Sequence, residues 1–265
     1  MSRRNLGMFT PQVIGAIVLA FLLLPIFAVV PASFTASSFI KIPPQEYSTR
    51  WYVAFLGDQE WIRSVFTSVE VALFATTLSL VIGTLAALGL ARATRMTRSI
   101  VTGLMLAPMI VPVIMTSIAL YYMMRLVGLQ GSVLGLALAH TLLCLPFVVL
   151  NIGVSLARFD QSLLRAATGL GAGHLYAFRT VTMPAIKPGL FAGAAFAFIT
   201  SFDEVVVSTF LAGTGAKTLP IKLFEQIRVE FTPVAAVGST AILAVTIVLF
   251  GIVQFSRRKG QQTNE

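Results

Sequence analysis

Two adjacent carboxylates, Asp203 and Glu204, lie inside an apolar stretch of the sequence that is long enough to cross a membrane. An ionised carboxylate facing lipid is costly, so we expect both side chains to face a helix bundle or a wet cavity. Successive helical positions point about 100° apart, so one carboxylate can face a solute path while the other pairs with a neighbour. A structural ion pair or a helix cap is the alternative. The candidate path residues are these two together with Phe202 and Glu70, and the acidic residues among them favour a cationic solute over an anion.

Other signals for chemistry are weaker. His140 is expected to form a hydrogen bond between helices, and without a second membrane histidine or a carboxylate at helical spacing we predict no metal site. Cys144 is the single cysteine, which excludes an intrachain disulfide. Residues 213–218 lack the glycine that a phosphate loop has directly before its lysine, and residues 169–174 lack the last glycine of a dinucleotide-binding loop. We therefore predict no catalytic site and no cofactor on this chain.

The composition is that of a membrane protein. Hydrophobic residues make up 57% of the 265 and charged residues 11%, whereas about a quarter of a soluble domain is charged. About 20 apolar residues are needed for a spanning helix. Six stretches meet this length: residues 11–34, 65–90, 100–124, 133–156, 188–212 and 233–255. Alternation with a period of two is absent, so we expect helices.

The first stretch follows Arg3 and Arg4, as a signal peptide would. It is longer than the apolar core of a secretory signal, about 7–15 residues, and no cleavage site of small residues ends it. We therefore expect a retained first helix. The predicted fold is an all-α membrane protein with six transmembrane helices, forming a single domain over residues 1–265.

The distribution of charge predicts the topology. With the N-terminus inside, six spans place the C-terminus inside as well. The inner segments then contain twelve of the nineteen Lys and Arg residues, as the positive-inside rule requires. We expect both termini to be cytoplasmic, and we interpret the net charge of +9 as a consequence of topology rather than of nucleic-acid binding.

The inner stretch over residues 157–187 is unusual, because the other inner loops have fewer than ten residues. Its alanines favour a helix, and the glycines around Gly171 favour a turn before a second short helix. A helix–turn–helix of this kind, lying parallel to the membrane, could dock on a cytoplasmic protein.

This stretch resembles the cytoplasmic coupling loop of permeases from ABC importers. The family pattern is Glu-Ala-Ala, three residues, Gly, about nine residues, a branched aliphatic residue, one residue and Leu-Pro. Arg165 stands in place of the usual Glu, and Met183 in place of the usual Leu. The resemblance implies that the ATPase contacts lie at Arg165, Ala166, Ala167, Gly171, Ala172, Met183 and Pro184.

The resemblance covers nearly the whole chain and is strongest to permeases of the spermidine/putrescine type, on residues 48–52, 145–149, 201–207 and 218–220. It implies a type I importer transmembrane domain (MetI-like) in the bacterial inner membrane. The implied partners are a cytoplasmic ATPase dimer that holds ATP and Mg²⁺, a second permease that is a different chain, an extracytoplasmic solute-binding protein and membrane lipid. The chain itself is not expected to be an enzyme.

Two alternatives stay open at this point. The cargo could be an aminoalkyl phosphonate, an opine, an amino acid or a metal chelate. A secondary transporter or channel is the alternative from another class, but it would need an ion-coupling site and usually an internal repeat with broken helices. We find no convincing repeat, and such a protein has no need of a docking loop of about thirty residues.

Overall fold

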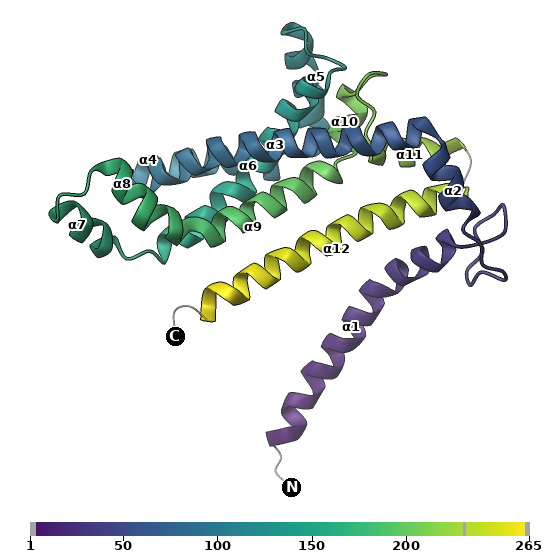
Figure 1. The fold of residues 1–265 in the computed structure, drawn as a ribbon, viewed down its shortest axis with the longest axis horizontal. Helices are drawn as coiled ribbons and strands as arrows, with labels where there is room; N and C mark the ends of the chain where they lie inside the picture. The colour runs from purple at the N-terminus through teal and green to yellow at the C-terminus, as the bar shows by residue number, and fades with distance from the viewer. Residues whose placement is uncertain (1–3, 230–231, 263–265) are drawn as a thin grey trace. The chain divides into compact units, whose positions relative to one another are not determined.

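The computed structural model describes residues 4–229 and 232–262 (Figure 1). Within these residues the chain is helical, and the β-type pairing is a single bridge between Thr35 and Tyr47. The chain divides into two compact units, of which the first comprises residues 1–62 and 223–244 and the second residues 63–222 and 245–265.

Five described segments are long and apolar enough to cross a membrane. Two helices, α4 (Arg95–Ile110) and α5 (Val113–Leu126), pass the same test only together, as one span bent by 103°. Counting this pair as one span gives the six predicted from composition. The five single segments are Val13–Ser33 in α1 (Arg4–Ser33), α3 (Gln59–Arg92), α6 (Val133–Ala157), His174–Phe202 ending in α9 (Met183–Phe202), and Pro233–Ile252 in α12 (Pro233–Gln262).

Two predicted spans are not continuous helices, which corrects the sequence interpretation. The stretch over residues 100–124 breaks before Pro112, because a residue that precedes proline is disfavoured in the helical conformation. Val111 is accordingly extended, with φ −70° and ψ 133°. The stretch over residues 188–212 breaks after Phe202, and the chain resumes a helix in α10 (Val206–Leu211).

The core of the second unit forms where α3, α6 and α9 pack together. A cluster of buried residues joins them: Ala75, Ala87, Cys144, Val148, Ile152, Ile186 and Ala197. Small residues allow close approach of membrane helices. At Gly189 of α9, a Cβ atom would lie 2.6 Å from the carbonyl oxygen of Asn151 in α6, so only glycine fits there.

The second helices of the two interrupted spans, α5 and α10, pack together. Val207 and Leu211 of α10 share a buried cluster with Leu120 and Met124 of α5. The loop before α6 also joins this region, because the Gly131 N–H donates to the Leu211 carbonyl over 3.0 Å. Figure 1 shows α7 and α8 at one end of α6 and α9, and α10 near the other end.

The short loop between α3 and α4 is closed by Arg98. Its guanidinium donates to the Leu90 carbonyl over 2.9 Å and to the Ala91 carbonyl over 3.1 Å. These carbonyls belong to the last turn of α3 and have no partner within the helix. This arginine, which the sequence counts toward the positive-inside rule, thus also caps a helix.

The first unit contains α1, α2 (Arg50–Gly57) and the C-terminal part of α11 (Leu219–Val229). Hydrogen bonds join α2 to the end of α1 and to the segment between the two helices. The Tyr52 and Ser33 hydroxyls lie 2.7 Å apart, and the Trp51 indole N–H donates to the Ser37 carbonyl over 3.1 Å.

Candidate functional site

The predicted coupling loop forms a helical hairpin outside the α6–α9 bundle. It consists of α7 (Gln161–Gly169), α8 (His174–Ala177) and a π-helical turn, η1 (Phe178–Thr182), that leads into α9. Asp160 caps α7, because its carboxylate accepts the Ser162 backbone N–H over 2.8 Å. Hydrogen bonds from the Ser162 backbone and then from its hydroxyl hold the pKa of Asp160 below its usual range.

The turn after α7 requires glycine for its backbone. Gly171 has φ +87°, in the region that side chains disfavour. The Ala172 N–H donates to the Ala167 carbonyl and the Gly171 N–H to the Thr168 carbonyl, each over 3.0 Å. This pair of hydrogen bonds defines a Schellman motif. The turn predicted at Gly171 is confirmed.

Sequence reasoning missed the π-helical turn. The Met183 N–H donates to the Phe178 carbonyl, five residues earlier. Pro184 follows at the start of α9. It has no N–H to donate, and in a regular α-helix its ring would clash with the carbonyl oxygen of the residue four positions earlier. Proline at this position therefore accounts for a widened turn, and it was the signal available in the sequence.

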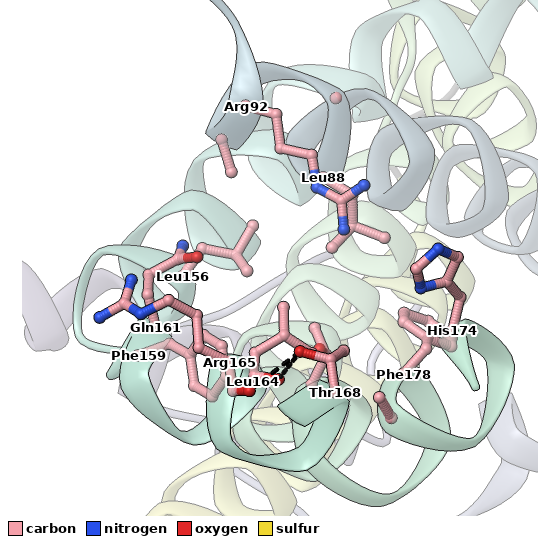
Figure 2. Close-up of a pocket in the computed structure, with 14 residues that line it drawn as sticks. Leu88, Arg92, Leu156, Phe159, Gln161, Leu164, Arg165, Thr168, His174 and Phe178 are labelled. Atoms are coloured by element: carbon pink, nitrogen blue, oxygen red, sulfur yellow. Dashed lines mark hydrogen bonds between the residues drawn. The ribbon is translucent and has the colours of Figure 1, made fainter. Parts of the chain in front are cut away.

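A hollow of about 440 Å³ lies between the hairpin and the adjoining ends of α3 and α6 (Figure 2). Arg92 of α3, Arg165 of α7 and His174 of α8 belong to its lining, and none of the 14 lining residues is acidic. Leu164, Arg165 and Thr168 line it from the same face of α7. Arg165, which stands where the family pattern has glutamate, therefore belongs to the face of α7 that borders the hollow.

The outward part of the hairpin carries large apolar side chains. Leu163, Leu170, Leu175 and Tyr176 are 55%, 90%, 62% and 67% exposed. Exposed apolar patches are typical of sites that contact a protein or a membrane. The sequence pattern of this stretch did not identify these four residues as an exposed surface. We name these four residues the hairpin surface.

The structure places the predicted contact residues at different depths. Ala166 and Gly171 are exposed, whereas Ala167 and Ala172 are half-buried. At the start of α9, Pro184 is exposed, whereas Met183 is half-buried and packs on the α3–α6–α9 core. The motif therefore combines an outward turn with residues that anchor it to the bundle.

The interruption between α9 and α10 contains Asp203 and Glu204, so the expected helical angle between them does not apply. Asp203 is exposed at the end of α9. The Glu204 carboxylate caps α10: Oε1 accepts the N–H groups of Val206 and Val207 over 3.0 Å each, and Oε2 accepts that of Ser208 over 2.9 Å. The Glu204 side chain is 8% exposed.

His140 of α6 joins both sides of this interruption. Its side chain is fully buried, with Nδ1 at 2.8 Å from the Ser201 hydroxyl of α9 and Nε2 at 3.0 Å from the Ser208 hydroxyl of α10. Nε2 also lies 3.7 Å from Oε2 of Glu204. The predicted role of His140 in bonding between helices is confirmed.

The other two predicted path residues take no part in these hydrogen bonds. Phe202 is 3% exposed, and its ring stacks on Phe198 with centroids 5.6 Å apart. Glu70 is exposed on α3. The structure thus brings Asp203 and Glu204 together through the interruption and adds His140, Ser201 and Ser208, which the sequence did not assign to a site.

Within its described residues the chain is a helical membrane protein with interrupted spans and a capped helical hairpin before its fifth span. Residues 79–261 match the family model of the binding-protein-dependent transport system inner membrane component. The chain therefore belongs to this family, whose members are membrane permeases and not the catalytic subunits.

Curated relatives narrow the comparison. The spermidine/putrescine transport system permease protein PotC of Escherichia coli (strain K12) is 31% identical over 230 residues, which are 87% of each chain. PotC of Haemophilus influenzae is 30% identical over 243 residues, covering 92% of this chain and 94% of the relative. The putrescine transport system permease protein PotI of E. coli (strain K12) is 33% identical over 240 residues, covering 87% and 84%.

Solved structures agree on the fold. A chain of a bacterial ABC transporter that imports the acidic polysaccharide alginate superposes with a TM-score of 0.75 at 18% identity, covering 96% of this chain and 98% of that chain. A chain of an amino acid ABC transporter gives 0.57 at 15% identity, covering 79% and 95%. At these identities the likeness extends to the fold alone.

Proposed function

We propose that this permease forms half of the translocation path for a small cationic solute of the polyamine class. The observation that carries this proposal is the similarity, over most of the chain, to permeases named for spermidine and putrescine transport. The exposed Asp203 carboxylate at the α9–α10 interruption supports a cationic cargo.

The electrostatics of Asp203 fit transport rather than storage of a cation. Two unit charges 4 Å apart attract by about 1 kcal/mol in water and about 4 kcal/mol at an effective dielectric constant near 20. The attraction between a cation and an exposed carboxylate lies between these two energies. It offsets part of the hydration that a polyamine loses, while the binding stays weak enough for the solute to leave.

Coupling is assigned to the hairpin. In this proposal a cytoplasmic ATPase dimer, which binds ATP and Mg²⁺, docks on the turn at Gly171 and on the hairpin surface. A second, different permease completes the path, and an extracytoplasmic binding protein delivers the solute. The complex lies in the bacterial inner membrane with both termini of this chain in the cytoplasm.

Topology is tested with a reporter enzyme that is active only outside the cytoplasm. Fused after Glu265, it should be silent, because six spans return the chain to its starting side. The same reporter fused in the outer loop near Lys41 should be active and serves as the control. Activity after Glu265 would contradict the count of six.

Cargo is tested in proteoliposomes that contain the chain with its co-purifying ATPase, second permease and binding protein. ATP-dependent uptake of labelled spermidine and putrescine is measured beside that of a neutral and an anionic solute. Asp203→Asn should lower polyamine uptake several-fold in an assembled complex, and Asp203→Glu, which keeps the charge, should lower it less. Uptake of the anion alone, or normal polyamine uptake by Asp203→Asn, would show that the cation-path proposal is wrong.

A further inference from the structure

Asp203 and Glu204 have opposite surroundings although they are neighbours in the sequence. The Asp203 side chain is exposed, and no side-chain hydrogen bond or ion pair joins it to another described residue. Both oxygens of Glu204 are occupied, by three backbone N–H groups at 2.9 to 3.0 Å. A passing cation therefore has access to one carboxylate, while the other holds the protein backbone.

The donors that Glu204 satisfies are the free N–H groups at the start of α10. The first N–H groups of a helix have no partner within it, and leaving them unpaired in a largely buried place is costly. Glu204 lies two residues before Val206, the first residue of α10. The length of a glutamate side chain, compared with aspartate, is needed for the carboxylate to reach the N–H group of Ser208. Aspartate at this position has the same charge but is one methylene shorter.

His140 of α6 holds the same interruption through its two ring nitrogens. Ser201 belongs to the last turn of α9 and Ser208 to the first turns of α10, and one imidazole ring contacts both hydroxyls. A movement of α10 relative to α9 must break at least one of these two contacts. Since Ser208 also donates its N–H to Glu204, the cap and the imidazole hold the same residue.

We propose that Glu204 and His140 are positioning residues, which hold the α9–α10 interruption so that Asp203 alone presents its carboxylate to the solute. This inference rests on the proposed cation path and assigns separate roles within it. It also replaces the prediction that Glu204 lines the path. The solute would meet one carboxylate from this chain at the interruption, at a position set by a buried joint of α6, α9 and α10.

Charge and length at position 204 are separated by two substitutions. Glu204→Gln keeps the length and leaves one oxygen for Val206 and Val207, whereas Glu204→Asp keeps the charge but cannot reach all three donors. We expect polyamine uptake to fall further in Glu204→Asp than in Glu204→Gln. A carboxylate that binds the solute directly gives the reverse order, and that order would overturn the proposal.

Accessibility provides a readout that does not depend on transport. The native chain has one cysteine, Cys144, which is buried. An introduced thiol can therefore be labelled with little labelling of this chain by its native cysteine. A cationic thiol reagent applied to the assembled complex should label Asp203→Cys, and it should label Glu204→Cys several-fold more slowly. Equal labelling at the two positions would contradict separate roles.

The role of His140 is tested by combining substitutions. If the imidazole acts by placing Asp203, then His140→Ala combined with Asp203→Asn should lower uptake no more than the stronger single change does, because interacting residues are not additive. His140→Asn, which keeps a polar group near Nδ1, should restore part of the uptake. Independent, multiplying losses would assign His140 to general stability and overturn the proposal.

Milder variants decide the case in which His140→Ala or the Glu204 variants fail to assemble. Ser201→Ala and Ser208→Ala each remove one hydroxyl contact and leave the backbone bonds in place. Each should change the labelling rate of Asp203→Cys several-fold, and an unchanged rate in both would overturn the proposal. Normal uptake by Asp203→Asn, in contrast, contradicts the cation path itself, so the two failures are distinguishable.

Discussion

The turn at Gly171 offers the sharpest test of the coupling role proposed for the hairpin. Its φ of +87° lies in the left-handed region, where a side chain costs about 1–2 kcal/mol. A Cβ atom added at this glycine would have no other atom of the chain within 4 Å, so the cost comes from the backbone and not from a clash. One to two kcal/mol corresponds to a factor of about 5 to 30 in the population of the native turn.

A series of substitutions at Gly171 turns this cost into a rank order. Asparagine tolerates the left-handed region better than alanine does, and a β-branched residue is the least tolerant. We therefore expect coupled transport to fall from Gly171→Asn to Gly171→Ala to Gly171→Val. Aspartate is nearly isosteric with asparagine, so a further loss in Gly171→Asp reports the added charge at the proposed ATPase contact.

The assay is the ratio of solute imported to ATP hydrolysed, measured in proteoliposomes alongside assembly of the complex. Because α7 is anchored by its own cap and the turn lies outside the bundle, all four variants should assemble. Uptake should fall while ATP hydrolysis continues, so the ratio falls in the stated order. Normal coupling in Gly171→Val would refute the reasoning, and equal losses in Asn and Ala variants would assign the effect to contact rather than to backbone conformation.

Two further predictions concern the ends and the packing of helices. Asp160→Ala should fray α7 and lower coupling, whereas Asp160→Asn keeps a capping oxygen and should couple nearly normally. Because the folded-state pKa of Asp160 is lowered, its cap is fully present above the usual aspartate pKa and is lost only as pH falls through the lowered value; coupling measured from pH 6 to 8 should show no change from this group. Gly189→Val places atoms against the backbone of α6 and should destabilise the chain by about 1–3 kcal/mol, seen as a lower melting temperature. Gly153→Ala is the control, since a Cβ there meets nothing within 4 Å, and an equal effect of both would contradict the close approach.

Composition and local sequence predicted much of this architecture. The apolar stretches gave the spans because lipid leaves few other ways to satisfy a backbone. Gly171 gave the turn, since a glycine after an alanine-rich helix is a local signal that needs no tertiary partner. Pro112 is the local signal for the break before α5, because proline restricts the residue that precedes it.

The break after Phe202 could not have been predicted in the same way. Residues 203–205 are Asp, Glu and Val, none of which is a strong helix breaker. The interruption depends on groups distant in the sequence: His140 contacts Ser208, which is 68 positions away. The choice between a path carboxylate and a cap at Glu204 likewise depended on where this break lies, which local sequence does not specify.

The π-helical turn between the hairpin and α9 makes the connection sensitive to the number of residues and not only to their types. It contains one residue more than an α-helical turn of the same height would. Deleting one residue within Phe178–Thr182 would let this turn close as an ordinary α-helical turn and would leave the directions of α7 and α8 nearly unchanged. Inserting one further residue would rotate α7 and α8 by about 100° around the axis of α9. The hairpin surface would then point in a different direction while every side chain that forms it stayed the same. In this permease, the length of the segment between Gly171 and Pro184 is therefore itself a determinant of which way the hairpin surface points.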